Sequence, residues 1–385
     1  MNDALELICE LVKCRSVTPN NDGCIQIVED YLKSLGFSTN VFECSDPEGW
    51  NVNNLYASIG SQGPSIAFVG HVDVVPVGDI VKWESNPFEP TVKGDFLFGR
   101  GVADMKGAIG CFCQAVSEYI SENDGIKDGS IIFLITGDEE EGSQQGTRSL
   151  INWCLKNNKM PNYCLIGEPT CRDFLGQGIN VGRRGSINFK VTSNGTQGHV
   201  AYPEFANNAI DPLISFLNTL MAKKLDTGSE GPKTTIEITS ISVDNEVSNI
   251  IPGKAEATFN IRFNNNYTGE SLSRMFQDMA SLISPNLEVK ANVSGEPFVC
   301  DSDLLISSIK NAVTDVLEVD PELTTGGATS DGRFLINYCP VVEFGMTYNS
   351  IHKENEMIKI CDINNLVKVY KRFLYNFFGS FESKE

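Results

Sequence analysis

No stretch of this 385-residue sequence approaches the ~18 consecutive apolar residues that a helix needs to span a bilayer. The strongest apolar run, residues 131–135, has only the length of a strand. The first fifteen residues also lack the basic start and apolar middle of a secretory signal, and carry Asp3, Glu6 and Glu10 instead. We therefore expect a soluble, cytoplasmic protein with no membrane partner.

Positive charge is scarce. Lys and Arg number 30 against 50 Asp and Glu, which gives a formal net charge of −20. Such a surface repels phosphate backbones, and we find no basic face in the sequence, so we expect no nucleic-acid partner. Apolar residues make up 41% of the chain, which is enough to bury a sizeable core and excludes a disordered chain.

Cysteines are numerous, twelve in all, but they lack the short paired spacings of zinc ribbons and disulfide frameworks. Cys111 and Cys113 are two apart on a predicted helix, and side chains at that spacing do not converge. We therefore interpret the cysteines as buried, reduced thiols. Dinucleotide-binding glycine spacing, a phosphate-binding Gly-Lys-Ser/Thr stretch and a Gly-x-Ser-x-Gly elbow are missing as well.

Helical and strand-like segments alternate along much of the chain. Apolar residues recur at helical spacing in the segments 4–12, 24–35, 105–119, 305–316 and 366–377. Short apolar runs predict buried strands at 65–70, 131–135, 163–166 and 341–344. Strands that alternate with helices in this way predict an α/β layered fold.

The middle of the chain follows a different order. Strands are predicted near 186–192, 234–243, 255–263 and 287–293, with helices at 209–220 and 272–283. The order βαββαβ is the split-βαβ arrangement, which forms a compact unit. We therefore predict one domain made of residues 1–181 and 296–385, into which a second domain, residues 182–295, is inserted.

Histidine is rare: only His71, His199 and His352 occur. A lone histidine is usually a core residue with satisfied hydrogen bonds, but each of these lies beside other informative residues. His71 follows a predicted buried strand, and Asp73 lies on the same side of the extended chain. An aspartate there can accept the second imidazole N–H, which fixes the tautomer of a metal-binding histidine.

Carboxylates gather where predicted strands end. The acidic run 138–141 follows one buried strand, and Glu168 follows the next. Asp104 precedes a predicted helix, where an ordinary N-cap explains it equally well. An acidic run is usually a solvated face, but carboxylates that converge at buried strand ends repel one another unless a cation balances them. Together with two histidines they predict a dinuclear metal centre.

Several motifs resemble the co-catalytic zinc aminoacylase and carboxypeptidase family of metallopeptidases, in the family's order and along nearly the whole chain. They are residues 71–76 (HVDVVP), 99–107 (GRGVADMKG), 138–140 (DEE), 167–169 (GEP), 182–186 (GRRGS), 198–203 (GHVAYP), 249–253 (NIIPG), 330–334 (SDGRF) and 351–356 (IHKENE). Two departures fall in the expected substrate loop. Residues 326–330 carry one residue more than the family's Gly-Gly-Thr-Ser, and Asn349 lies three residues before His352 instead of four.

The resemblance implies a mixed-sheet catalytic domain that holds two Zn²⁺ ions per subunit, with Co²⁺ or Mn²⁺ accepted in their place. By this resemblance, His71 and Glu168 hold one ion, Glu140 and His352 hold the other, and Asp104 bridges both. The inserted domain is implied to be ferredoxin-like and to mediate a homodimer.

The resemblance also implies roles in amide hydrolysis of an acylated amino acid. Asp73 orients His71, and Glu139 is the general base that takes a proton from a bridging water. His199 reaches the active site of the other subunit, where it stabilises the tetrahedral oxyanion.

The implied substrate is a small anionic molecule, although the protein itself is strongly acidic. Binding therefore requires local donors, for which the candidates are the cations Arg183, Arg262 and Arg333 and the neutral residues Asn249 and Tyr202. Two alternatives stay open. One is a related hydrolase with another acyl preference, and the other is a metal-binding protein without catalysis.

Overall fold

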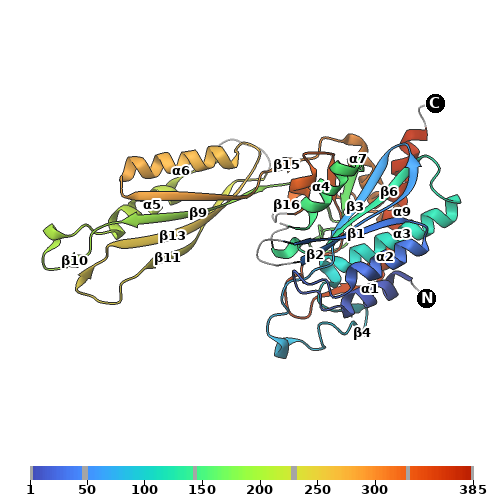
Figure 1. Cartoon of the computed structure of the whole chain (residues 1–385), viewed down its shortest axis with the longest axis horizontal. Coiled ribbons are helices and arrows are strands. Elements are labelled where there is room, and N and C mark those ends of the chain that lie inside the picture. The colour runs from blue at the N-terminus through green and yellow to red at the C-terminus, as the bar shows by residue number, and fades with distance from the viewer. Residues whose placement is uncertain (1–2, 46–50, 142–144, 227–231, 327–329, 383–385) are drawn as a thin grey trace. The chain divides into compact units, whose positions relative to one another are not determined.

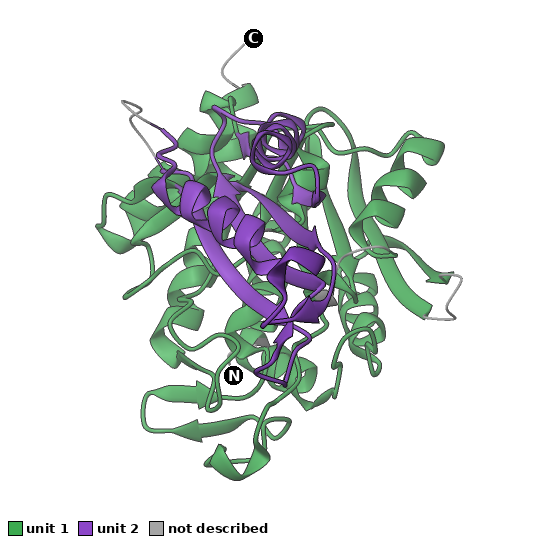
Figure 2. Ribbon diagram, turned by 90° about the vertical axis from the view of Figure 1, so that its left-hand side faces the viewer, with its two compact units in different colours: residues 1–182, 300–324, 330–385 green, residues 183–299, 325–329 purple. Residues whose placement is uncertain are grey.

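The computed structural model describes residues 3–45, 51–141, 145–226, 232–326 and 330–382. The chain divides into two compact units, coloured separately in Figure 2: unit 1 comprises residues 1–182, 300–324 and 330–385, and unit 2 comprises residues 183–299 and 325–329. The catalytic and dimerisation roles expected for the two parts of the chain, and domain limits at 181/182 and 295/296, stay predictions.

Unit 1 is built on a mixed sheet, which confirms the predicted fold class (Figure 1). Seven of its strands, in order across the sheet, are β1 (Ser38–Ser45), β2 (Asn51–Gln62), β6 (Gly129–Thr136), β3 (Ser65–His71), β7 (Tyr163–Ile166), β17 (Val341–Glu343) and β8 (Gly178–Arg183). The four strands β6, β3, β7 and β17 are parallel, whereas β1 and β2 pair antiparallel at one side. The carboxyl ends of the parallel strands therefore meet at one edge.

Helices cover both faces of this sheet. One face packs against α1 (Asp3–Lys13), α2 (Cys24–Ser34), α3 (Gly107–Asn123), α7 (Asp303–Leu317) and α9 (Ile360–Glu382), and the other against α4 (Thr147–Asn157) and the short α8 (Gly332–Leu335). Every residue of β3 is buried, because its side chains alternate between two cores. None of the described helices combines the length and the apolar character that a membrane span requires.

Several short strands complete the described chain. β4 (Thr91–Lys93), β5 (Phe96–Phe98) and β18 (Met357–Lys359) form a small sheet of their own. β10 (Gly198–His199) pairs with β12 (Ile250–Ile251). β15 (Phe298–Val299) and β16 (Glu322–Gly326) lie where the chain passes between the two units along its sequence.

Unit 2 has the predicted βαββαβ order: β9 (Gly185–Asn194), α5 (Ile210–Ala222), β11 (Thr235–Val243), β13 (Lys254–Phe263), α6 (Gly269–Ile283) and β14 (Leu287–Gly295). The antiparallel sheet order is β11-β13-β9-β14, with β11 at one edge. Side chains of β13 alternate between buried and more exposed positions, as expected of a sheet with one face on a core. In that core Phe189 stacks on Phe259, with ring centroids 4.6 Å apart.

Candidate metal centre

The candidate ligands lie at the edge where parallel strands end. His71 is the last residue of β3, the turn Glu139–Glu141 follows β6, and Glu168 follows β7. Because β6, β3 and β7 are neighbouring parallel strands, their carboxyl ends bring these residues together. The expectation that the carboxylates gather at strand ends is therefore met by the topology of the sheet.

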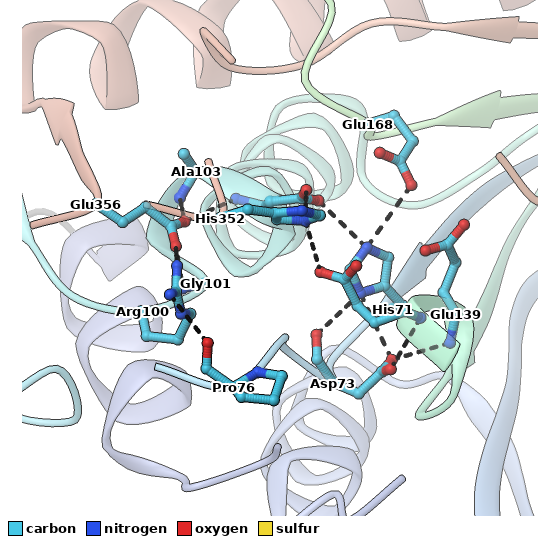
Figure 3. A network of polar contacts seen from close by, with 12 residues as sticks. His71, Asp73, Pro76, Arg100, Gly101, Ala103, Glu139, Glu168, His352 and Glu356 are labelled. Atoms are coloured by element: carbon cyan, nitrogen blue, oxygen red, sulfur yellow. Dashed lines mark hydrogen bonds and ion pairs between the residues drawn. The ribbon is translucent and has the colours of Figure 1, made fainter. Parts of the chain in front are cut away.

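Two sets of side chains have the spacing of metal ligands (Figure 3). His71, Asp104 and Glu168 form the first set, and Asp104, Glu140 and His352 form the second, with ligand atoms within 4.8 Å of one another in each. In the first, Nε2 of His71 is 3.3 Å from Oδ1 of Asp104 and 3.6 Å from Oε1 of Glu168. In the second, Nε2 of His352 is 3.3 Å from Oδ2 of Asp104 and 3.2 Å from Oε1 of Glu140. Asp104 therefore offers one oxygen to each set.

The two sets differ in exposure. The side chain of His71 is 2% exposed, whereas that of His352 is 49% exposed. One set is thus enclosed by protein, and the other is open on the side of His352, where a small molecule can approach.

The segment that carries Asp104 is not an ordinary helix start. Residues Val102–Lys106 form one π-helical turn in which Asp104 has non-helical dihedral angles, and the Asp104–Met105 peptide bond is cis. α3 begins only at Gly107, and its N-cap is Lys106. The N-cap interpretation of Asp104 is therefore wrong, and its carboxylate is directed to the histidines instead.

Asp73 contacts more than His71. Nδ1 of His71 is 3.0 Å from the backbone oxygen of Asp73 and 3.5 Å from its carboxylate. The same carboxylate accepts the backbone N–H groups of Glu139, at 3.2 Å, and Glu140, at 3.1 Å. Asp73 therefore joins the end of β3 to the acidic turn after β6, which the sequence did not indicate.

Nearby carboxylates raise the pKa values of the two histidines of the site. Burial lowers the pKa of His71, but attraction to Asp104 and Asp73 outweighs it and raises the pKa well above its usual range. Hydrogen bonds to Asp104 and Glu140 raise the pKa of His352 to about 10. Burial opposes ionisation of Asp104, yet His352 and His71 hold the pKa of its carboxyl below the usual range. The surroundings thus demand positive charge, which an imidazolium or a cation can supply.

Glu139 lies beside the ligands in a strongly acidic environment. Burial, followed by repulsion from Glu168 and Asp331, raises the pKa of its carboxyl well above the usual range. It belongs to neither of the two ligand sets. Membership of a ligand set thus distinguishes Glu140 from Glu139, although the two are adjacent in sequence.

The remaining predicted residues are divided between the units. His199, Tyr202, Asn249, Arg183 and Arg262 belong to unit 2, and Arg333 lies on α8 of unit 1. Unit 2 brings three of them together: His199 pairs with Ile250 across β10 and β12, its ring is 5.8 Å from that of Tyr202, and the N–H of Val200 donates to the carbonyl of Asn249. The extra residue predicted near Gly326 falls on residues 327–329, which lie outside the described chain.

One charged pair beside the site was not predicted. Arg100 and Glu356 are each only 1% exposed, and Nη1 of Arg100 is 2.8 Å from Oε2 of Glu356 (Figure 3). Both residues lie inside motifs that carry the family resemblance, 99–107 and 351–356. Their opposite charges are the feature of the sequence that could have indicated a pair. Sequence alone does not reveal that two charges so far apart in the chain meet in the interior.

Comparisons with known proteins agree with this geometry. Residues 67–376 match the model of peptidase family M20/M25/M40. A protein named succinyl-diaminopimelate desuccinylase from Rickettsia massiliae (strain Mtu5) is 42% identical over 371 residues, which is 95% of this chain and 97% of the relative. A protein of the same name from Pelagibacter ubique (strain HTCC1062) is 40% identical over 379 residues, 97% of this chain and 98% of the relative.

A solved structure has the same fold. The M20 family metallo-carboxypeptidase Sso-CP2 from Sulfolobus solfataricus superposes with a TM-score of 0.76 at 20% identity, over 98% of this chain and 99% of that one. Since the family model matches most of the chain and the curated relatives align with nearly all of it, the chain belongs to peptidase family M20/M25/M40.

Proposed function

We propose that the protein hydrolyses the succinyl amide of N-succinyl-LL-2,6-diaminopimelate to succinate and LL-2,6-diaminopimelate, a step of lysine and cell-wall precursor synthesis. The observation that carries the proposal is the 42% identity, over nearly the full length of both chains, with a relative named for this reaction. The ligand sets at the strand ends supply the chemistry that an amide hydrolase of this family needs.

The proposal includes two divalent cations, with zinc as the first choice and cobalt or manganese as substitutes. The residues fit such ions: two imidazoles and three carboxylates converge, and the buried Oδ1 of Asp104, 3.3 Å from Nε2 of His71, is not aligned for a hydrogen bond with any described residue. His71 and Glu168 would hold one ion, Glu140 and His352 the other, and Asp104 both. When bound, the ions lower the pKa of a water and polarise the substrate carbonyl.

Glu139 is assigned the proton transfers. It accepts the proton of the attacking water and delivers it to the amide nitrogen as the C–N bond breaks, so that the amine of diaminopimelate leaves and the succinyl group becomes succinate. Its backbone is held by the hydrogen bond to Asp73, so its carboxylate is placed by the same contact that orients the ligand turn. Asp73 also contacts His71, which keeps that imidazole in the tautomer with Nε2 free for a cation.

His199 is assigned the stabilisation of the oxyanion, in the active site of a partner subunit. The backbone N–H of Ala201 donates to Nδ1 of His199 at 3.0 Å. A neutral imidazole that accepts at Nδ1 carries its proton on Nε2, so this exposed side chain presents an N–H donor. Such a donor suits a developing negative charge on the carbonyl oxygen.

The homodimer on which this role depends is part of the proposal. β11 forms an edge of the sheet of unit 2, and its Ile241 is 60% exposed. On α5, Ile214 is 51% and Met221 is 74% exposed. An unpaired edge strand beside exposed apolar side chains is typical of a surface that a second copy covers.

Arginines are assigned to the carboxylates of the substrate. Arg183 lines a cavity of ≈190 Å³ in unit 2 together with Arg184 and Asn264. Nη1 of Arg262 and Nε of Arg333 are buried and hydrogen-bond no described residue, so each has a donor to offer. We also propose a cytoplasmic location, since all twelve cysteines are free thiols, as is usual in a reducing compartment.

Succinate release from N-succinyl-LL-diaminopimelate by the zinc-loaded protein tests the function. N-acetylornithine is the matched substrate for the nearest alternative, an acetylornithine deacetylase. A higher kcat/KM for the acetylated compound would replace our proposal with that alternative. Zinc binding without hydrolysis of either compound would favour a non-catalytic relative.

A further inference from the structure

The carboxylate of Glu356 is surrounded by four donors. Its Oε1 accepts the backbone N–H groups of Ala103, at 2.9 Å, and Asp104, at 3.2 Å. Its Oε2 accepts the N–H of Gly101, at 2.9 Å, and the guanidinium of Arg100, at 2.8 Å. One buried side chain therefore determines the course of the backbone that leads into Asp104.

Arg100 extends this connection to two other loops. Its guanidinium donates to the backbone oxygen of Lys353, the residue after His352, at 3.2 Å. It also donates to that of Pro76, in the loop that follows Asp73, at 3.2 Å (Figure 3). The pair thus joins the segments that carry candidate ligands from three separate parts of the chain.

The loop around Asp104, residues 101–106, is not held in this conformation by its own backbone hydrogen bonds alone. Gly101 has φ +82°, and a Cβ there would clash with Cγ1 of Val74. Within the isolated π-helical turn 102–106, the N–H groups of Val102 and Lys106 donate to backbone carbonyls. Those of Ala103 and Asp104 donate instead to the carboxylate of Glu356.

We propose that Glu356, paired with Arg100, is a positioning residue of the metal centre, which holds the loop of Asp104 against the turn of His352 and so forms the second ligand set before any cation arrives. The inference rests on the proposed metal centre. It assigns Glu356 no contact with substrate or cation, only control over where Oδ2 of Asp104 and Nε2 of His352 lie.

Glu356→Gln is the sharpest test. Both carboxylate oxygens accept from donors, so an amide must direct its own N–H₂ at an N–H or at Arg100. Asp104 and His352 would then lose their fixed separation. We expect zinc alone, titrated into the metal-free variant, to bind the second set about 10–100-fold more weakly than it binds the wild-type protein. This is the usual loss of metal affinity when a residue that supports a ligand, without touching the metal, is replaced. Binding to the first set, in which only Asp104 depends on Glu356, should change less.

Glu29→Gln is the matched control, because Glu29 is also a buried carboxylate and accepts from Gln26 on α2 and Thr39 on β1, elements that carry no candidate ligand. It should lower the melting temperature without changing zinc affinity. Equal loss of zinc affinity in the two variants would overturn the proposal, since general destabilisation would explain both. Unchanged zinc affinity in Glu356→Gln would overturn it too. A wild-type protein that binds no zinc would instead reject the proposed metal centre itself.

If Glu356→Gln does not fold, two further measurements still test the proposal. Arg100→Met combined with Glu356→Gln leaves no unpaired buried charge, so it should be more stable than Glu356→Gln alone, yet bind zinc as weakly. Recovery of wild-type affinity in the double variant would overturn the proposal. In the wild-type protein without metal, the amides of Gly101, Ala103 and Asp104 should exchange slowly with solvent. Rapid exchange at all three would contradict a preformed loop.

Discussion

Glu139 and Glu140 are adjacent, but their side chains meet different neighbours. Oε1 of Glu140 is 3.2 Å from the imidazole of His352, whereas Glu139 lies near Glu168 and Asp331 and in neither ligand set. A proton acceptor in amide hydrolysis must stay clear of the cations and keep a lone pair for the water. The arrangement therefore supports the proposal that Glu139 transfers the proton and Glu140 binds a cation.

Glu139→Gln should keep both zinc ions and lower kcat by about 10²–10⁴-fold, because an amide of the same volume does not accept the proton. Glu140→Gln is the matched variant and should lose zinc from one site together with activity. Zinc content by atomic emission and steady-state kinetics on both variants check this. Near-normal turnover of Glu139→Gln with full zinc would reject it as the base, and equal zinc loss in both would mean that the roles are exchanged.

Among the elements, the end of β3 and the turn after β6 depend on one another through Asp73. Asp73→Asn leaves one oxygen for two backbone N–H groups and directs an N–H₂ at the other. We expect the free energy of unfolding to fall by about 1.5–3 kcal/mol, the value of hydrogen bonds to a charged group, and kcat to fall about 10–100-fold. Chemical denaturation and kinetics measure the two effects. A variant as active as the wild type would show that the turn holds its shape without Asp73.

The cysteines of α3 give a second prediction for an element. Cys111 and Cys113 are fully buried, and burial raises the pKa of both thiols, so neither is ready to bind a cation. Replacing both by Ala should lower the free energy of unfolding by about 0.5–3 kcal/mol through lost packing, with zinc content unchanged. Loss of one zinc from the double variant would contradict this interpretation.

The elements that could be predicted from the sequence are those whose apolar residues follow a clear helical or strand pattern. β7 was predicted at its observed bounds and β13 within one residue, because apolar residues alternate or run unbroken there. β1 was missed because it is partly exposed and has no apolar face, and β4, β5 and β18 are too short to show a period. The helix α4 was not predicted either, although Leu150, Ile151 and Cys154 form its buried stripe.

The candidate site shows the same limit of sequence reasoning. Carboxylates that follow buried strands were found, because strand ends and acidic residues are both visible in a sequence. The turn around Asp104 and the contacts of Glu356 were not, because a buried charge is tolerated only through partners that tertiary structure supplies. Which residue contacts which loop is therefore information that only the folded chain contains.

For the whole molecule, the proposal that His199 acts across subunits predicts complementation. His199→Ala should lower kcat much more than it raises KM, with zinc content unchanged, because the donor acts on charge that develops in the transition state. Mixed with Glu139→Gln and re-equilibrated, it should form dimers in which one site has both intact residues. Random pairing of equal amounts should restore about one quarter of wild-type activity. Mixtures as inactive as either parent would exclude the arrangement in trans.

The order of the ligands along the chain has a consequence for biosynthesis. His71, Asp104 and Glu168 leave the ribosome before unit 2, and His352 with Glu356 leaves after it. Unit 2 has its own core, so it can fold while unit 1 is still incomplete. A nascent chain paused before residue 352 therefore contains the first ligand set without the second and without the acceptor that holds the loop of Asp104. If the proposed ligands are correct, the second cation can be bound only after residues 352–356 have been synthesised.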